Sequence, residues 1–271
     1  RGRGRQHHPV GRRETYPSTS TLSFDPDTYT GSGDLLSGRV ILITGASDGI
    51  GKALALKTAT LGAQVILHGR NTKKLEGVYD EIEAIEGAPR PSIAVLDLAA
   101  ADSEAYTNLA ASIEEEFGRL DGLVHNAGIL GQRLSIAQYD IAEWQRVLHV
   151  NLTVPFVLTQ LLLPYLDAAE DPSIIFTSSG VGRVGKGYWG AYSVSKFGIE
   201  ALSQILADET QHTSLRTNCI NPGPVRTKMR LEAYPAEDRD KLKTPEDILP
   251  TYLYLLGPDS RGVTGQSFDV Q

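Results

Sequence analysis

The sequence has little cysteine, no long apolar run and no overall positive charge, and each shortage excludes a class of protein. A single cysteine, Cys219, excludes an intramolecular disulfide and any metal site built from several cysteines. Such cysteine usage fits a reducing compartment, so we expect a cytoplasmic location. No apolar run approaches the ~18 residues that cross a membrane. A net charge of -7 disfavours a nucleic-acid contact over the whole surface. We therefore expect neither a membrane nor a nucleic acid as partner.

The charge is divided unequally between the start of the chain and the remainder. Residues 1–20 carry +4, from five arginines and one acid, which leaves -11 for the rest. Residues 1–34 have no sustained apolar period, and we interpret them as a disordered basic arm or a non-functional leader. A transit peptide and an RNA-binding arm are the alternatives. The domain itself is expected to span residues 35–271.

Short β-branched runs alternate with longer helical segments from residue 35 onward. The expected strands are 40–44, 64–68, 93–96, 122–125, 173–177, 215–220 and 266–270. The expected helices are 50–61, 72–85, 103–117, 141–163, 191–210 and 245–256. Pro155 should bend the long helix 141–163 or mark a break within it. The alternation predicts one Rossmann-like, doubly wound α/β domain, with a seven-stranded parallel sheet and helices on both faces.

A glycine pattern, G-x-x-x-G-x-G, follows the first expected strand and opens the first expected helix. Glycines there let the backbone turn tightly and approach a pyrophosphate, which the helix N-terminus attracts. Any tight turn uses glycine, but this place at the first strand-to-helix turn favours a dinucleotide. The contacts expected in this turn are Gly45, Ser47, Asp48, Gly49, Ile50 and Gly51.

The end of the second expected strand indicates which dinucleotide is bound. NAD sites place an acid there to hold the ribose 2′-hydroxyl, whereas this segment reads His-Gly-Arg-Asn. Arg70, beside Asn71, can pair with a 2′-phosphate, so we expect NADP(H) to be preferred over NAD(H). The alternative is that Arg70 is simply solvated.

Tyr192 and Lys196 lie four residues apart on an expected helix and so share one face. A nearby ammonium favours the phenolate and so lowers the pKa of a tyrosine. The pair can therefore act as a proton donor, Tyr192, and a cation that adjusts its pKa, Lys196. The spacing alone also fits an ordinary surface pair. Two serines, Ser178 and Ser179, precede Tyr192 by fourteen and thirteen residues. Their presence makes it less plausible that the Tyr-Lys spacing arose by chance.

These motifs together resemble the classical short-chain dehydrogenase/reductase family, over about residues 35–271. The resemblance rests on TGASDGIG at 44–51 and on Asp97-Leu98, Asn126-Ala127-Gly128, Asn151, Ser178-Ser179, Tyr192-x-x-x-Lys196 and Pro222-Gly223. Longer strings, such as HNAGILG and WGAYSVSKF, are similar to its YciK-type branch of uncharacterised oxidoreductases.

The resemblance implies an oxidoreductase that transfers hydride between the nicotinamide of NADP(H) and a carbonyl or alcohol substrate. Tyr192 would be the proton donor, Lys196 its tuner and ribose anchor, and Ser179 the binder of the substrate oxygen. The main-chain carbonyl of Asn151 would hold a water that relays protons to Lys196. Tyr192 and Lys196 are also implied cofactor contacts, and the further ones are Asp97, Leu98, Asn126, Ala127, Gly128, Pro222, Gly223, Val225 and Thr227. The resemblance also implies a homodimer or homotetramer and no metal.

The substrate side of the expected site is less defined. Candidate contacts are Ser179, Arg183, Trp189 and Met229, and residues 227–243 are expected to form a flexible lid. Five cations fall on these loops, Arg183, Lys186, Arg226, Lys228 and Arg230. They indicate an anionic substrate or extra contacts to NADP phosphates, or they are merely solvent-facing. A nucleotide-binding sensor or scaffold without turnover is the alternative function.

Overall fold

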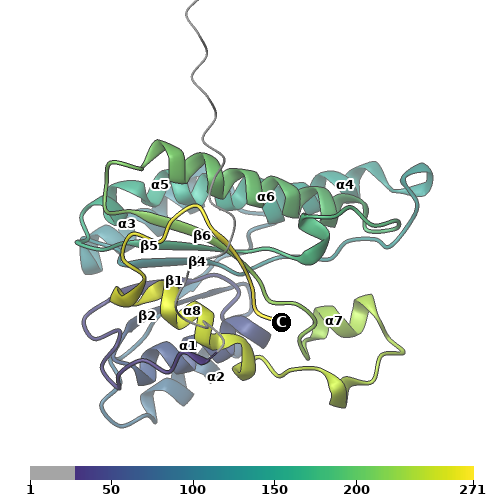
Figure 1. Ribbon diagram of the computed structural model, residues 1–271. Helices are drawn as coiled ribbons and strands as arrows, with labels where there is room; N and C mark the ends of the chain where they lie inside the picture. Colours follow the sequence, from purple (N-terminus) through teal and green to yellow (C-terminus); the bar gives the residue numbers. More distant parts are fainter. Residues whose placement is uncertain (1–27) are drawn as a thin grey trace, which may run out of the picture.

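The computed structural model describes residues 28–271, whose strands form one parallel sheet in the order β3-β2-β1-β4-β5-β6-β7 (Figure 1). The strands are β1 Val40–Ile43, β2 Gln64–Gly69, β3 Ser92–Val95, β4 Gly122–His125, β5 Ser173–Thr177, β6 Arg216–Asn221 and β7 Ser267–Asp269. The strand order reverses between β1 and β4, where ligands bind in such sheets. The predicted seven-stranded parallel sheet is confirmed.

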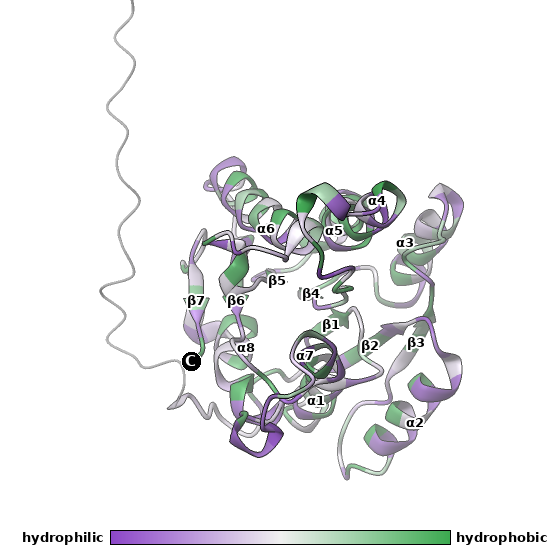
Figure 2. Ribbon diagram, turned by 90° about the vertical axis from the view of Figure 1, so that its right-hand side faces the viewer, coloured by the Kyte–Doolittle hydropathy of each residue, from purple (hydrophilic) through white to green (hydrophobic). Residues whose placement is uncertain are grey.

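Helices cover both faces of the sheet, as predicted. The helices are α1 Gly49–Thr60, α2 Thr72–Glu83, α3 Ser103–Phe117, α4 Ile141–Leu148, α5 Val154–Asp167, α6 Gly190–Glu209, α7 Lys228–Ala233 and α8 Leu249–Leu256. Apolar residues of α1, α2 and α8 form one core with the sheet, and those of α3, α5 and α6 form the other. Figure 2 shows α5 and α6 on one side of the strands and α1 and α8 on the other. Strands β1, β4 and β5 are buried throughout, as expected of strands covered on both faces.

The long helix expected over 141–163 is interrupted. Between α4 and α5 lies a π-helical segment, His149–Thr153, and Pro155 stands in the first turn of α5. In an uninterrupted α-helix the N–H of residue 155 would bond the carbonyl of residue 151, but proline has no N–H. The interruption therefore falls beside Asn151, one of the predicted site residues.

The stretch Ile141–Asp167, taken as one helix, is long and apolar enough to cross a membrane by length and composition. Its most apolar window has a mean hydropathy of 1.5 and is 44% buried. Leu158, Leu162 and Leu166 are fully buried against the sheet, at 1% exposed or less. Packing in the core thus accounts for part of its apolar character.

The predicted arm reaches residue 34, and its residues 1–27 lie outside the described part of the chain. Tyr29, near its end, is only 8% exposed and belongs to the same core as Leu35. Its hydroxyl donates to Asp259 Oδ2 at 2.8 Å, and its ring meets Tyr254 edge-on. Packing against the domain therefore begins before the predicted boundary at residue 35.

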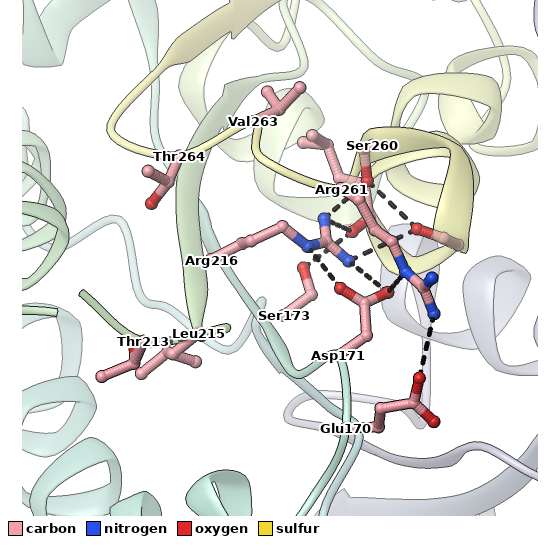
Figure 3. A network of polar contacts seen from close by, with 12 residues as sticks. Glu170, Asp171, Ser173, Thr213, Leu215, Arg216, Ser260, Arg261, Val263 and Thr264 are labelled. Carbon is pink, nitrogen blue, oxygen red and sulfur yellow. Dashed lines mark hydrogen bonds and ion pairs between the residues drawn. The ribbon is translucent and has the colours of Figure 1, made fainter. Parts of the chain in front are cut away.

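A buried ion network joins the amino ends of the strands, opposite the expected site (Figure 3). Asp171 accepts from Arg39 at 2.7 Å and from Arg216 at 3.1 Å. Arg216, 3% exposed, also donates to the carbonyl of Leu255 and to Ser260. Burial lowers the pKa of Arg216, while Asp171 acts in the opposite direction. The network fastens the C-terminal end of α8 to β5 and β6.

Candidate active site

The glycine turn after β1 has the shape that a pyrophosphate requires. Gly45 and Gly49 adopt φ angles of 68° and 51°, which residues with a Cβ rarely adopt. A Cβ on Gly51 would lie 2.1 Å from the carbonyl oxygen of Gly45. Asp48 caps α1, accepting from the Gly49 N–H at 2.8 Å. The turn thus presents bare backbone at the start of a helix, and this fits a dinucleotide phosphate.

Thr44, which the sequence analysis did not select, ties the glycine turn to the segment after β4. Its Oγ1 accepts from the N–H groups of Asn126 and Ala127, each at 3.0 Å. The amide of Asn126 donates back to the Thr44 carbonyl at 3.2 Å. The two segments that flank the reversal of strand order are therefore held in fixed register. The position of Thr44, directly before the first glycine of the turn, is the sequence feature that could have identified it as a site residue.

The end of β2 places Arg70 in solvent and uses Asn71 as a helix cap. Asn71 Oδ1 accepts from the Lys74 N–H at 3.0 Å, so its side chain stabilises the start of α2. Lys74 pairs with Asp48 at 2.9 Å, across the mouth of the glycine turn. Arg70, the residue before Asn71, is exposed. Arg70 and Lys74 thus supply two cations near the predicted 2′-phosphate position.

Asp97 and Leu98 follow β3 at the same edge of the sheet. The Asp97 carboxylate accepts from the Ala99 N–H at 3.0 Å and so shapes its own turn. Leu98 is buried, and its carbonyl accepts from the hydroxyl of Tyr106 at 3.2 Å.

Helix α6 brings Tyr192 and Lys196 together in the interior. Tyr192 is 8% exposed and Lys196 is 5% exposed. The Lys196 ammonium lies over the Tyr192 ring, 5.6 Å from its centroid, and donates to the Thr177 carbonyl at 2.8 Å. The spacing argument for a shared helix face therefore agrees with the structure.

The pKa values of this pair follow from burial. Burial raises the pKa of Tyr192, and a hydrogen bond with Ser179 acts in the opposite direction. Burial lowers the pKa of Lys196 to about 8, against smaller upward effects of Cys219 and Glu200. The sequence argument expected Lys196 to lower the pKa of Tyr192. Here the ammonium bonds the Thr177 carbonyl and lies over the tyrosine ring, so burial dominates.

Asn151 lies between the segment after β4 and α6. Its side chain bonds both the N–H and the carbonyl of Ile129 at 2.9 Å and donates to Ser195 at 3.1 Å. A Cβ on Gly128 would lie 3.4 Å from Asn151 Oδ1 and 3.8 Å from Lys196 Nζ. The amide side chain of Asn151 thus holds neighbouring segments together. The main-chain carbonyl of Asn151 lacks its regular α-helical donor, because residue 155 is a proline and has no N–H.

Ser178 and Ser179 follow β5. The Ser178 N–H continues the sheet by donating to the Ile220 carbonyl at 2.7 Å. The Ser178 hydroxyl is buried with no hydrogen-bond partner among residues 28–271. The Ser179 hydroxyl is the one that reaches Tyr192, so the structure brings together the serine, tyrosine and lysine predicted from the sequence.

The segment after β6 contributes the other side of the expected cofactor groove. Gln271 donates to the carbonyls of Pro222 and Pro224 at 2.6 and 2.9 Å. A Cβ on Gly223 would lie 2.9 Å from that amide. Val225 is buried, and Thr227 caps α7. The lid, residues 227–243, contains this helix, which the sequence analysis did not predict.

An apolar cluster surrounds Tyr192 on the substrate side. Trp189 is 6% exposed, with its ring centroid 5.5 Å from that of Tyr192. The partly buried residues that pack against it include Ile129, Tyr139, Trp144, Val181, Met229, Ala233 and Tyr234. Trp189 and Met229, two of the predicted substrate contacts, thus belong to the cluster around Tyr192, and this region is apolar and aromatic.

Arg183 does not face this cluster freely. Its guanidinium bonds Asp269 and Ser267, each at 2.6 Å, and Glu200 at 3.3 Å. These contacts fasten β7 to α6, so we leave Arg183 out of the substrate contacts. Two further members of the predicted cation group are also paired. Arg230 makes two 2.6 Å bonds to Glu237, and Arg226 lies 3.7 Å from Asp240.

Arg133 and Tyr234 are further site residues that the sequence analysis missed. Arg133 lies between β4 and α4, and its guanidinium stacks 4.1 Å from the Trp189 ring centroid. Tyr234 lies 6.0 Å from the same ring. Neither belongs to a recognisable motif, so only the tertiary packing of the loops reveals them.

Comparison with known proteins agrees with this geometry. The model of the short chain dehydrogenase family matches residues 39–238. The chain is 50% identical over 243 residues to the uncharacterized oxidoreductase YciK of Escherichia coli K12, covering 90% of this chain and 96% of that one. A putative short chain dehydrogenase from Shigella flexneri 2a, solved with NADP, is similar at 50% identity and a TM-score of 0.86. The match covers 89% of this chain and all of that one. One from Escherichia coli CFT073, solved with NADPH, is similar at the same identity and TM-score, covering 89% and 99%. The chain belongs to the short-chain dehydrogenase family.

Proposed function

We propose that the protein is an NADP(H)-dependent carbonyl reductase that also catalyses the reverse alcohol oxidation. The observation that carries this proposal is the burial of Tyr192 and Lys196 on one face of α6, with Ser179 close enough to lower the pKa of the tyrosine. A protein that only binds a nucleotide has no need of a buried tyrosine and ammonium beside the pocket. This argues against the sensor or scaffold alternative.

In the proposed reaction the chain's own groups handle the substrate oxygen and the proton. NADPH supplies the hydride when bound, in the groove between the glycine turn and the segment after β6. Ser179 holds the carbonyl oxygen, and Tyr192 donates a proton to it as negative charge develops. Lys196 stabilises the phenolate that Tyr192 becomes. Asn151 positions the loop at Gly128. Pro155 has no N–H to donate to the main-chain carbonyl of Asn151, and we assign this carbonyl to the proton-relay water.

The apolar cluster around Tyr192 and the paired arginines Arg226 and Arg230 favour a carbonyl compound with an apolar or aromatic body. Lys186 and Lys228 remain exposed at the mouth, so an anionic group at the outer end of the substrate is still compatible. A panel of aldehydes, ketones, keto acids and their methyl esters, assayed with NADPH and NADH, tests the proposal. Absence of turnover across the panel with both nucleotides would count against it.

Arg70 is expected to select NADP(H) over NAD(H). Replacing Arg70 by Ala should raise the KM for NADPH by about 10- to 100-fold, since hydrogen bonds to charged groups are individually strong. The KM for NADH should change little. Lys57→Ala, an exposed change in the last turn of α1, is the matched control. An equal loss with both nucleotides would contradict this role.

Carbonyl reduction is expected to decline above pH about 8. Burial lowers the pKa of Lys196 to about 8, so its ammonium is present below this pH and lost above it. The support for the phenolate is lost with it, and kcat/KM for the carbonyl should fall about tenfold per pH unit. Profiles at saturating NADPH, corrected for NADPH binding, measure this. A flat profile to about pH 10, near the ordinary lysine pKa, would contradict it.

Assembly into a homodimer or homotetramer is part of the proposal. Exposed apolar side chains gather on α5 and α6, at Phe156, Val194, Phe197 and Ile205, each 42–55% exposed. Apolar side chains in such number on adjacent helices are typical of protein interfaces.

A further inference from the structure

Arg133 links the lid to the turn that precedes Tyr192. Its Nη1 donates to the carbonyl of Ala233, the last residue of α7, at 2.9 Å. Its Nε donates to the carbonyl of Tyr188 at 3.2 Å. One side chain therefore bonds two loops that approach the apolar cluster from opposite layers of the fold.

Aromatic rings flank the same guanidinium. It lies 4.1 Å from the ring centroid of Trp189 and 5.3 Å from that of Tyr234. Arg230 lies 4.0 Å from the Tyr234 ring and is itself fixed by Glu237. Tyr234 is thus in contact with two cations, one from the lid and one from outside it, and such contacts stabilise an aromatic side chain in place.

The Tyr188 carbonyl that Arg133 holds belongs to a strained residue. Tyr188 has a φ of 68°, and it is the one non-glycine residue with positive φ within residues 28–271. A residue with a Cβ adopts this conformation only when its surroundings impose it. Tyr188 directly precedes Trp189, and α6 begins at Gly190. The bond from Arg133 therefore acts on the start of the helix that carries Tyr192.

The lid is anchored at both ends and covers the tyrosine. Val225 and Lys243 form a bridge, and the Arg226 N–H donates to the Lys243 carbonyl at 2.8 Å. Between these ends, Met229, Ala233 and Tyr234 pack against the cluster that contains Tyr192. Tyr192 itself is 8% exposed, so the position of the lid affects the side chains that surround the proposed proton donor.

We infer that Arg133 is a positioning residue that latches the lid over the substrate pocket and determines how firmly the closed pocket holds a carbonyl substrate. The kinetic consequence rests on the proposed function, whereas the latch itself is a property of the free protein. A lysine cannot replace Arg133, because two divergent carbonyls and flat stacking on rings require the planar guanidinium fork.

Trp189 provides a readout of the latch that does not depend on catalysis. The chain has two tryptophans, so Trp144→Phe leaves Trp189 as the only one. In this full-length background, without nucleotide, Trp189 should be poorly quenched by acrylamide because it is 6% exposed. Arg133→Ala should raise the quenching constant, since loss of two hydrogen bonds lowers the closed-to-open ratio by about 30-fold.

Four further variants separate the latch from a general loss of structure. Arg133→Lys should also raise quenching of Trp189, and Tyr234→Ala should raise it from the lid side. The Arg133→Ala/Tyr234→Ala pair should add little to either single change. Arg146→Ala removes an exposed arginine of α4 that pairs with Glu143, and it should leave quenching unchanged. Circular dichroism establishes that each variant is folded.

The kinetic arm measures KM and kcat separately. Arg133→Ala should raise the KM for the carbonyl about tenfold, leave kcat within about twofold, and leave the Kd for NADPH unchanged. Loss of kcat with unchanged KM would overturn the latch. Unchanged Trp189 quenching in folded Arg133→Ala and Tyr234→Ala would overturn it whether or not the enzyme turns over. Increased quenching with no turnover in any variant would instead reject the proposed function and leave the latch standing.

Discussion

Replacing Tyr192 by Phe should lower kcat for carbonyl reduction by roughly 10²- to 10⁴-fold, the range that a positioned general acid contributes. The change removes one hydroxyl from a side chain that is 8% exposed and keeps the ring against Trp189 and Lys196. Lys196 does not replace it as the donor, because its ammonium donates to the Thr177 carbonyl. The rate of NADPH oxidation with a reactive ketone measures the effect.

NADPH binding is the internal control for this variant. Because the glycine turn and Arg70 are untouched, the Kd for NADPH should stay within about twofold of the unmodified protein. Tyr79→Phe, which removes a hydroxyl from the outer face of α2, is the matched control and should leave kcat unchanged. A Tyr192→Phe protein that reduces ketones at nearly the normal rate would show that another group donates the proton.

Replacing Asp171 by Asn should lower the free energy of unfolding by about 3–5 kcal/mol, which is the cost of removing one partner from a buried ion pair. Arg216 is 3% exposed and would keep its charge in the interior without a carboxylate. Arg39 would lose its 2.7 Å ion pair at the same time. For a domain of this size the loss corresponds to a fall in Tm of roughly 6–20 °C, measurable by calorimetry.

Glu170 supplies the matched control next in the chain. Its carboxylate is 91% exposed and lies 3.6 Å from Arg261, so Glu170→Gln should change the unfolding free energy by no more than about 1 kcal/mol. The network lies at the amino ends of the strands (Figure 3), away from Tyr192. Folded Asp171→Asn should therefore keep its kcat, and a change in stability no larger than that of Glu170→Gln would contradict the account.

The strands were predictable because most are short runs rich in apolar residues, and β1, β4 and β5 are buried throughout. All seven were located to within a few residues, and their alternation with helices was enough to predict the parallel sheet. The break between α4 and α5 was predicted at Pro155, but its π-helical form and the contacts of Asn151 with Ile129 and Ser195 were not, because these partners are distant in sequence. Helix α7 was missed because six residues are too few for a periodic pattern.

The residues of the candidate site also fall into those that local sequence patterns predict and those that only the tertiary structure shows. Tyr192 and Lys196 were predicted because a spacing of four residues on one helix is enough to place the proton donor and the ammonium on the same face. The structure differs from the sequence argument at Arg183, whose partners Glu200 and Asp269 come from α6 and the end of the chain. Arg133 could not be predicted as a site residue. Its contacts join three loops that are distant in sequence and lie side by side only in the folded chain. Contacts between distant loops are where sequence patterns carry least information.

The most direct test of the central claim is hydride transfer itself. The full-length protein is incubated with a ketone of the panel that it turns over and with NADPH that carries deuterium on the transferable face of the nicotinamide. The product alcohol is then examined by mass spectrometry. We predict deuterium on the carbinol carbon, and a loss of labelled product in Tyr192→Phe. NADPH binding without deuterium in any alcohol, across the whole carbonyl panel, would contradict the account and favour a nucleotide-binding role without turnover.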